Sequence, residues 1–599
     1  MHEHLLLQLS GIICVGVATA WLAWRTNLPS ILLLILAGII AGPITGWLDV
    51  DGIFGELLSP LVSMSVAIIL FEGGLTLNIS DLKKIGTVVR NMLTLGVLVT
   101  WVLTTLASHY FLEIGWSLST LIGAILVVTG PTVIGPLLKQ IRPVGSVATV
   151  LRWEGIVIDP IGVMLAVLVF EVILIRNPLE VPFLTALTVL KTAFFGGGIG
   201  FLMGWLLIKT YKRNLVPHYL QNAFTLMAVI GSFLAADLFQ QEAGLLTVTV
   251  MGVMMASQKE VSIEHIVEFK ENLQLLLIPS LFIILASRLE LSDINNFHMN
   301  SLKFIGALIL VIRPASVILS SFGSGLNWKE RLFLCWMAPR GIVAAAMASV
   351  ITIELTQFGF AGAELLVPTV FWAILGTVAV YGLTAGPLAY LLKLADPNPQ
   401  GMLIVGGHDW AQAIAKFLKD QGIKSFIVDT NMENIHRAHA NGLSAIKLNI
   451  LAEASAEELD LNGIGRLIAI TPNEQVNAMA AMRFAPFFGK NKVFQLSTEH
   501  RKSTFQKEIS EKLRGRILFS SGMTFQFISE KLENKGQFDI IEITEDDQNV
   551  LATPQSGKVV IPLIAITPSK GVKVFAADNA PNLKKGDRLL VLESKQEEI

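Results

Sequence analysis

The chain has 599 residues, of which 53% are hydrophobic and only 15% are charged. This composition is far too apolar for a soluble enzyme of this length. The formal net charge of −2 averages both parts of the chain and is uninformative. The sequence has no basic face with interleaved aromatic residues, which argues against a nucleic-acid partner. The long apolar runs precede residue 395, so we expect a membrane part and then a soluble part that begins near Pro397.

Thirteen segments of the first part are apolar and long enough to cross a bilayer, which takes a helix of about 20 residues. We therefore expect residues 1–395 to form a polytopic α-helical membrane domain of about thirteen transmembrane helices. In chain order, the expected helices are 5–24, 29–48, 57–77, 85–111, 117–138, 146–175, 181–209, 219–239, 243–257, 271–288, 299–322, 331–352 and 366–393.

The charges of the predicted loops alternate along the chain, and basic residues gather in every second loop. The positive-inside rule places such loops in the cytoplasm. With an odd number of spans, the N-terminus is then periplasmic and the C-terminal part cytoplasmic, in a multi-pass protein of the bacterial inner (plasma) membrane. The basic residues that set this orientation are Arg25, Lys83, Lys84, Arg90, Lys139, Arg142, Lys209, Lys212, Arg213, Lys259, Lys270, Lys329 and Arg331.

Glycine and proline interrupt two of the expected helices. The fifth contains V-V-T-G-P-T-V-I-G-P with Gly130 and Pro131, and the twelfth contains A-P-R-G with Pro339 and Gly341. Such residues release backbone groups from the helix, which is tolerated at membrane depth where the groups line a cavity. A pair of interrupted helices in corresponding halves is typical of the binding site of a transporter built from inverted repeats.

Charged residues occur inside the apolar runs as well. Asp159 and Glu154 lie in L-R-W-E-G-I-V-I-D-P-I-G, and Arg340 lies in M-A-P-R-G-I-V. Ionisable groups at bilayer depth are costly and mark functional sites. Two acids and one arginine in separate segments predict a site for a cation or a proton with an internal counter-charge.

Five motifs in order resemble the monovalent cation/proton antiporter superfamily, on the sodium/proton exchanger branch. They are residues 28–43 (L-P-S to A-G-P), L-F-E-G-G-L at 70–75, T-G-P-T at 129–132, Glu154 to Asp159, and Trp336 to Gly341. The resemblance implies a homodimer with inverted repeats, two crossed broken helices and a mobile core that moves as an elevator. It implies antiport that supports pH homeostasis.

The resemblance also implies roles for particular residues. Asp159 is expected to bind Na⁺ or K⁺ in competition with protons, Thr129 to help line the ion site, and Glu154 to pair with Arg340. Two positions depart from the family pattern: Gly130 stands where aspartate is usual, and Ile158 stands where asparagine or a second aspartate is usual. A single carboxylate at this place favours one-for-one, electroneutral exchange.

The soluble part begins with a strand–turn–helix–strand pattern. The strand 400–405 leads into G-G-H-D-W-A (406–411), a helical segment follows, and the strand S-F-I-V-D ends at Asp429. This is a Rossmann-type unit with an acid at the ribose position. The residues expected to contact a nucleotide are Gly406, Gly407, His408, Asp409 and Asp429.

Residues 399–525 resemble the Rossmann-like RCK (TrkA N-terminal) domain of potassium-transport regulators, and 530–599 resemble its small α+β C-terminal subdomain. Asn477 matches an asparagine of that domain. The glycine pattern is incomplete, because His408 and Ala411 replace its second and third glycines. Two alternatives therefore stay open: the domain binds a regulatory adenine nucleotide (AMP, ADP, ATP or NAD(H)), or it binds no ligand at all. No hydride-transfer site or substrate domain follows, so we do not expect an enzyme.

The alternatives concern which cation is transported and whether the protein is an antiporter or a channel. The regulator-like domain favours potassium, as in a Kef-like K⁺/H⁺ efflux system, whereas R-W-E-G and A-P-R-G favour the sodium/proton branch. A potassium channel gated by an RCK domain would need a carbonyl filter such as T-V-G-Y-G, and the sequence has none.

Overall fold

The computed structural model describes residues 2–26, 28–141, 143, 145–174, 181–258, 260–261, 263–291, 298–395, 399–451, 459, 461, 463–497, 515–520, 522–534, 536–544 and 558–595. Arg142 and Lys259, which entered the orientation above, and the expected start at Pro397 lie outside these residues. The chain divides into two compact units, Met1–Ala395 and Asp396–Ile599.

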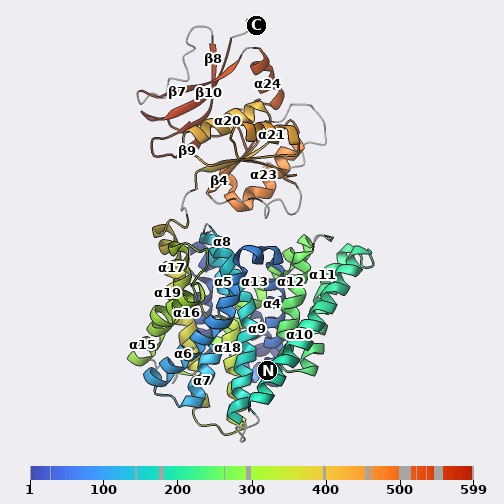
Figure 1. Ribbon diagram of the computed structural model, residues 1–599, viewed down its shortest axis with the longest axis vertical. Coiled ribbons are helices and arrows are strands. Elements are labelled where there is room, and N and C mark those ends of the chain that lie inside the picture. The colour runs from blue at the N-terminus through green and yellow to red at the C-terminus, as the bar shows by residue number, and fades with distance from the viewer. Residues whose placement is uncertain are drawn as a thin grey trace. The chain divides into compact units, whose positions relative to one another are not determined.

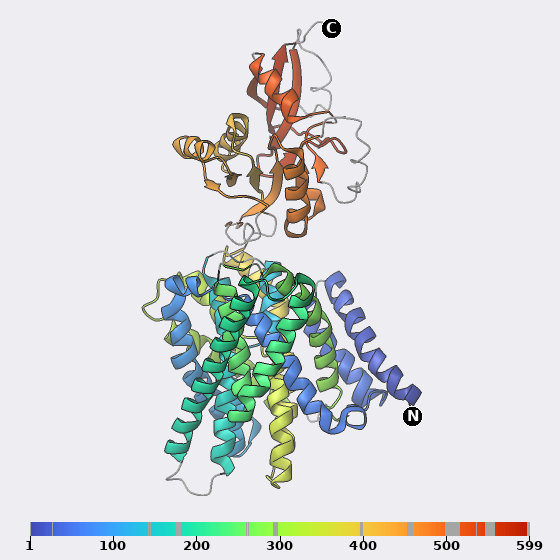
Figure 2. The same cartoon turned by 90° about the vertical axis from the view of Figure 1, so that its right-hand side faces the viewer.

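The first unit is a bundle of helices that run side by side in both views (Figure 1, Figure 2). Short π-helical turns at Ile40–Ile44, Met92–Gly96 and Leu308–Ile312 interrupt or extend three of its helical segments. The helices are α1 (His2–Thr26), α2 (Ser30–Ile39), α3 (Val50–Phe54), α4 (Leu58–Leu75), α5 (Leu82–Asn91), α6 (Val97–Leu112), α7 (Trp116–Ile125), α8 (Pro131–Ile141), α9 (Val147–Leu174), α10 (Val181–Lys212), α11 (His218–Phe239), α12 (Ala243–Ser257), α13 (Glu264–Ala286), α15 (Met299–Ala307), α16 (Arg313–Ser320), α17 (Trp328–Trp336), α18 (Ile342–Gln357) and α19 (Leu366–Leu391).

Within the described residues, eight helical segments are long and apolar enough to cross a membrane, and five shorter apolar ones have 10–17 residues. Each of the thirteen ranges expected from the sequence overlaps one of these segments. In an apolar window of 18 residues, 61% of the residues are buried in Val147–Leu174, whereas only 11% are buried in Leu5–Thr26. Helix α9 is therefore central in the bundle, and α1 exposes an apolar surface of the kind that faces lipid.

Glycines allow the central helices to approach closely. A Cβ atom on Gly252 of α12 would lie 2.4 Å from the carbonyl oxygen of Phe71 in α4. A Cβ atom on Gly74 of α4 would lie 2.7 Å from the carbonyl oxygen of Thr249. Small residues at such contacts are how helices associate in lipid, where burial of apolar surface provides little driving force.

The second unit contains a six-stranded parallel sheet in the order β3-β2-β1-β4-β5-β6. All five residues of the central strand β1 are buried, as expected for a parallel strand that helices cover on both faces. The order reverses between β1 and β4, which is where open α/β sheets bind ligands. The elements are β1 (Gly401–Val405), α20 (Asp409–Asp420), β2 (Ser425–Asp429), α21 (Met432–Ala440), β3 (Ala445–Lys447), β4 (Ile464–Ala469), α23 (Glu474–Phe488), β5 (Val493–Gln495) and β6 (Arg516–Ile517).

A smaller antiparallel sheet follows in the order β7-β10-β8-β9. It is preceded by helix α24 (Phe525–Glu533) and consists of β7 (Gln537–Glu542), β8 (Lys558–Ile566), β9 (Val572–Val574) and β10 (Arg588–Lys595). Leu563 and Leu590 of this sheet share one buried cluster with Ile404 and Phe417 of the parallel-sheet part. The two sheets are therefore packed into one unit.

Candidate functional site

The two interrupted helices meet at their breaks. Helix α7 ends at Ile125 and α8 begins at Pro131, while α17 ends at Trp336 and α18 begins at Ile342. The amide of Gly130 in the first break donates a 2.8 Å hydrogen bond to the carbonyl oxygen of Pro339 in the second. The four helix-break residues predicted from the sequence thus belong to two breaks that are in direct contact.

Gly130 and Gly341 leave no room for a side chain where the breaks cross. A Cβ atom on Gly130 would lie 2.5 Å from the Cα of Gly341, and one on Gly341 would lie 2.4 Å from the Cα of Gly130. Both distances are far below van der Waals contact, and both partners are backbone atoms. At Gly130, where the resemblance leads us to expect aspartate, the two breaks cross so closely that no larger residue fits.

Asp159 faces the first break from α9. Gly155, Asp159 and Gly162 are spaced four and three residues apart and share one helix face. A Cβ atom on Gly155 would lie 3.5 Å from the Cα of Pro131, and one on Gly162 would lie 2.3 Å from Cγ2 of Val128. Asp159 lies between these two contacts, opposite the segment that joins Val128 to Pro131.

Four buried oxygen atoms at this place have no hydrogen-bond partner among the described residues. They are both carboxylate oxygens of Asp159 and the hydroxyl oxygens of Thr129 and Thr132. Asp159 is 0% exposed, Thr129 2% and Thr132 4%. Buried polar groups are normally paired, so this cluster can accept a proton or a cation with a preference for oxygen ligands. The positive dipole ends at the starts of α8 and α18 favour negative charge at the break.

The expected pairing of Glu154 with Arg340 is wrong. Glu154 pairs with Arg313, the first residue of α16: Nη1 of Arg313 bonds Oε1, and Nη2 donates to Oε2 at 2.8 Å. Nε of Arg313 also donates to the carbonyl oxygen of Leu334 at 3.0 Å. The bidentate geometry satisfies the carboxylate and leaves it no need of a second arginine.

Arg340 instead holds the two breaks together. Its Nη1 donates to the carbonyl oxygens of Val127 and Val128 at 3.0 and 3.2 Å. These carbonyls follow the end of α7, where the helix provides no amide partner and the dipole is negative. The backbone amide of Arg340 donates to the hydroxyl of Thr377 in α19 at 3.2 Å. Arg340 does not pair with Glu154 because its guanidinium donates to these carbonyl oxygens, for which the end of α7 provides no other donor.

Sequence reasoning missed Arg313, Thr132 and Thr377. Arg313 stands in L-I-L-V-I-R-P, which gives the same signal as Arg340, a charge within an apolar run. Thr132 belongs to the T-G-P-T motif and could have been selected with Thr129. Thr377 gives no such signal, because nothing local distinguishes it from other threonines of apolar helices.

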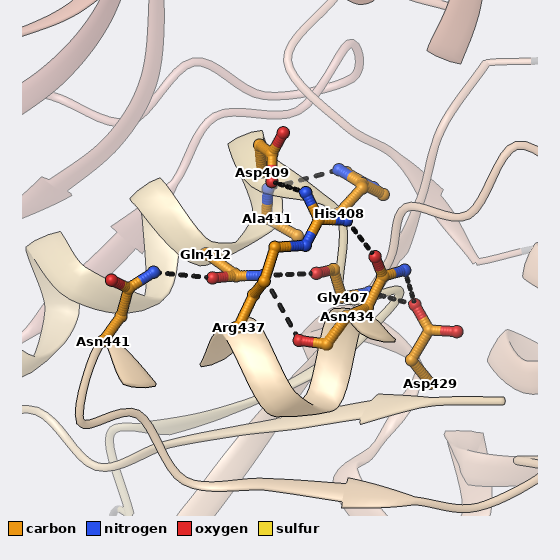
Figure 3. A network of polar contacts seen from close by, with 9 residues as sticks. All are labelled: Gly407, His408, Asp409, Ala411, Gln412, Asp429, Asn434, Arg437 and Asn441. Atoms are coloured by element: carbon orange, nitrogen blue, oxygen red, sulfur yellow. Dashed lines mark hydrogen bonds and ion pairs between the residues drawn. The ribbon is translucent and has the colours of Figure 1, made fainter. Parts of the chain in front are cut away.

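In the soluble unit, four of the five residues predicted to contact a nucleotide lie in one network of polar contacts, namely Gly407, His408, Asp409 and Asp429 (Figure 3). Gly406 has φ +112°, which favours glycine. The amide of Gly407 donates to Oδ2 of Asp429 at 2.6 Å. Nδ1 of His408 accepts from the amide of Ala411 at 3.3 Å, while its Nε2 donates to the carbonyl oxygen of Ile470 at 2.7 Å. Burial lowers the pKa of His408.

The rest of the network ties this turn to α21. Asp409 forms a 2.8 Å ion pair with Arg437, which also donates to Asn434 at 2.7 Å. The Gln412 side chain donates to the carbonyl oxygen of Gly407 at 2.8 Å. The side chain of Asn441 donates to that of Gln412 at 2.9 Å.

A cavity of about 460 Å³ lies at the carboxyl ends of β4 and β5. Thr471, Asn477 and Ser497 line one part of it, and Thr524 and Phe525 line another. Asn477 is buried and bonds the amide, hydroxyl and carbonyl of Thr471, so it fixes the turn that precedes α23.

Comparison with known proteins identifies relatives of both units. Residues 12–391 match the model of the sodium/hydrogen exchanger transmembrane family, and residues 402–510 match the TrkA-N domain. The Na(+)/H(+) antiporter 1 of Methanocaldococcus jannaschii is 27% identical over 57% of this chain and 82% of its own length. The K(+)/H(+) antiporter NhaP of Alkalimonas amylolytica is 25% identical over 66% of this chain and 68% of its own length.

A solved structure has the same fold in the membrane part. The sodium proton antiporter MjNhaP1 from Methanocaldococcus jannaschii at pH 8 superposes with a TM-score of 0.55 at 24% sequence identity. The match covers 65% of this chain and 99% of that chain.

Proposed function

The chain belongs to the sodium/hydrogen exchanger transmembrane family, and on this premise we propose that it exchanges a monovalent cation, Na⁺ or K⁺, for a proton across the membrane. It is a transporter and not an enzyme. The observation that carries the proposal is Asp159, which is fully buried, has no partner for either carboxylate oxygen among the described residues and faces the break that contains Thr129.

One buried carboxylate couples the two fluxes by competition. A protonated Asp159 has lost the charge that holds a cation, and an Asp159 that holds a cation does not need a proton. The empty, ionised carboxylate crosses the membrane poorly, because a bare charge at bilayer depth is costly. Each transit therefore carries either one proton or one cation.

The stoichiometry follows from the neighbours of Asp159. The adjacent Ile158 is buried and apolar, and Gly130 in the facing break has no carboxylate. Glu154 is paired with Arg313, so its charge is balanced within the protein. A site with a single exchanging charge supports electroneutral, one-for-one exchange.

We also propose how the protein moves during transport. Arg340 joins the two breaks, and the Glu154–Arg313 pair joins α9 to α16, so these helices form one braced group around Asp159. Such a group suits alternating access by an elevator movement of a core with inverted repeats against a dimerisation domain in a homodimer. We place the protein in a bacterial inner membrane, and the alternation of basic loops supports an orientation with the N-terminus in the periplasm and the soluble unit in the cytoplasm.

The ion is sodium or potassium. One relative is named as a Na⁺/H⁺ antiporter and another as a K⁺/H⁺ antiporter, and each is about a quarter identical to this chain. The TrkA-N unit supports the potassium alternative, a Kef-like K⁺/H⁺ exchange or efflux system that serves pH homeostasis. In either case, we propose that this unit regulates the exchange.

Proteoliposomes that contain the purified protein and an internal pH-sensitive dye test the function. Addition of external NaCl, KCl or LiCl is expected to move protons with at least one cation, and the ranking of the rates gives the selectivity. No proton movement with any of the three salts would contradict antiport.

Threonine variants test the place of the site. Thr129→Val removes one unpartnered oxygen and is expected to raise the KM for the cation several-fold. Thr120→Val is the matched control, because its exposed hydroxyl bonds the carbonyl of Trp116 in α7. Equal KM values for Thr129→Val and Thr120→Val would show that the Thr129 hydroxyl does not bind the cation.

A further inference from the structure

The turn that begins the Rossmann unit has the position of a nucleotide site but not its chemistry. A phosphate binds such a turn through free backbone amides at the start of the helix, and the second glycine lets it approach the backbone. We propose that side chains of this chain close the turn from Gly406 to Ala411, so that the soluble unit binds neither NAD(H) nor AMP, ADP or ATP.

Two of the amides of this turn, those of Gly407 and Ala411, already have partners. The amide of Gly407 donates to Asp429 at 2.6 Å, and the amide of Ala411 donates to Nδ1 of His408 at 3.3 Å. A phosphate would have to displace both acceptors (Figure 3). Displacing Asp429 would leave a carboxylate beside the incoming anion, and this repulsion adds to the lost hydrogen bonds.

His408 occupies the place of the second glycine and is fixed from several sides. Its Nε2 donates to the carbonyl oxygen of Ile470, which directly follows β4, at 2.7 Å. The centroid of its ring lies 4.3 Å from that of Trp410 in α20 and 5.0 Å from that of Phe525 in α24. Contacts with three separate elements hold the imidazole over the turn, where a phosphate would approach the backbone.

Asp429, the expected ribose ligand, is also engaged. Its Oδ2 accepts from Gly407 and from the side chain of Asn434 at 2.8 Å, and its Oδ1 accepts from the amide of Asn431 at 2.8 Å. The carboxylate therefore serves the turn and the start of α21. The residues that fit a nucleotide by sequence position do not fit one by geometry.

A regulatory unit of this kind acts without an adenine nucleotide. Its parallel sheet and its antiparallel sheet share one buried core, to which α24 contributes Ile528. Signals would then reach it through its contacts or through another class of ligand. The inference concerns binding to the soluble unit, so its test is independent of whether the membrane unit exchanges cations.

Binding measurements on the full-length protein in detergent test the closure. NADH, ATP, ADP and AMP are titrated separately by calorimetry, and NADH also by energy transfer from tryptophan. The wild type is expected to bind none of them up to millimolar concentration. His408→Gly is expected to gain at least about tenfold in affinity for one or more, which corresponds to about 1.4 kcal/mol.

Glycine is a tolerable N-cap, so α20 is expected to form in His408→Gly. His408→Ala removes the imidazole but keeps a Cβ atom. Its matched control is His436→Ala on the exposed face of α21, which is expected to behave as wild type.

Micromolar binding of any of these nucleotides by the wild type would overturn the proposal. Failure of His408→Gly to gain any binding would overturn the role assigned to His408. Hydrogen exchange provides a readout that does not depend on the variants: the amides of Gly407 and Ala411 are expected to exchange equally with and without NADH in the wild type. Slower exchange with NADH would also contradict a closed turn.

Discussion

Glu154 on α9 forms a bidentate ion pair with Arg313 on α16, and both side chains are almost completely buried. The pair joins two helices through residues that are 159 positions apart in the sequence. Arg340, the other buried arginine of the site, binds backbone carbonyls and not Glu154. Arg313 therefore balances the charge of Glu154, whereas Arg340 joins the two helix breaks. Variants of the two arginines are expected to have different effects on stability and exchange rate.

Arg313→Met leaves the Glu154 carboxylate buried without a partner. Loss of one member of a buried pair typically costs about 3–5 kcal/mol, so a large fall in thermal stability in detergent is expected. Replacing both residues, as Arg313→Met with Glu154→Leu, is expected to recover part of the loss, because no unpaired charge is left. Arg152→Met, which replaces an exposed arginine of α9, is the control. Equal destabilisation by Arg313→Met and Arg152→Met would show that the pair is not formed.

Arg340→Met removes the donors that serve the carbonyls of Val127 and Val128. Hydrogen bonds from a charged group are worth about 1.5–3 kcal/mol each, so the two breaks are expected to lose their register. The exchange rate in proteoliposomes is expected to fall at least tenfold. Arg340→Lys keeps the charge and one donor to this place, and it should recover part of the rate. A rate unchanged in Arg340→Met would contradict the bracing role.

Gly130→Ala tests the crossing of the breaks. The new Cβ would lie 2.5 Å from the Cα of Gly341, so the breaks must separate, at a cost of about 1–3 kcal/mol. Gly135→Ala in α8 is the matched control, since nothing lies within 4 Å of its Cβ position, and it is expected to stabilise the helix by up to about 1 kcal/mol. Thermal unfolding and exchange rates of both variants are the readouts. A stable and active Gly130→Ala would mean that the crossing is looser than described.

His408 gives the soluble unit a pH dependence. Burial lowers its pKa, and this outweighs the bond to Ile470 and the charges of Asp429 and Asp409, which raise it. The free imidazole has a pKa of about 6.5. Below that pH the unfolded unit takes up a proton at His408 that the folded unit resists, so the contribution of His408 to stability is complete above about pH 6.5 and is lost as the pH falls through the lowered pKa of the folded unit.

Denaturant unfolding of the full-length protein between about pH 7.5 and 5.5, followed by tryptophan fluorescence, measures this decline. His408→Gln carries no titrating ring and is expected to have a shallower dependence on pH than the wild type. His436→Gln, exposed on α21, should keep the wild-type slope. If the stability of His408→Gln depends on pH as steeply as that of the wild type, groups other than His408 cause the dependence.

Features with a local signal could be predicted from the sequence. Asp159 and Arg340 are charges in apolar runs, and the glycine and proline residues of T-G-P-T and A-P-R-G mark both breaks. The partner of Glu154 could not be predicted in the same way, because Arg313 and Arg340 are equivalent by composition and only the tertiary arrangement distinguishes them. The sequence also shows that His408 replaces a glycine of the turn. The hydrogen bond between His408 and Ile470 could not be predicted, because it joins residues 62 positions apart.

The exchange of one cation for one proton at Asp159 is tested most directly by Asp159→Asn in proteoliposomes. Asparagine keeps the size of the side chain and removes both its charge and its ability to titrate. With Glu113→Gln, which replaces an exposed acid at the end of α6, as the control, Asp159→Asn is expected to show no proton movement on addition of NaCl or KCl while it unfolds at the temperature of the wild type. Cation-driven proton movement by Asp159→Asn at the wild-type rate would contradict the account.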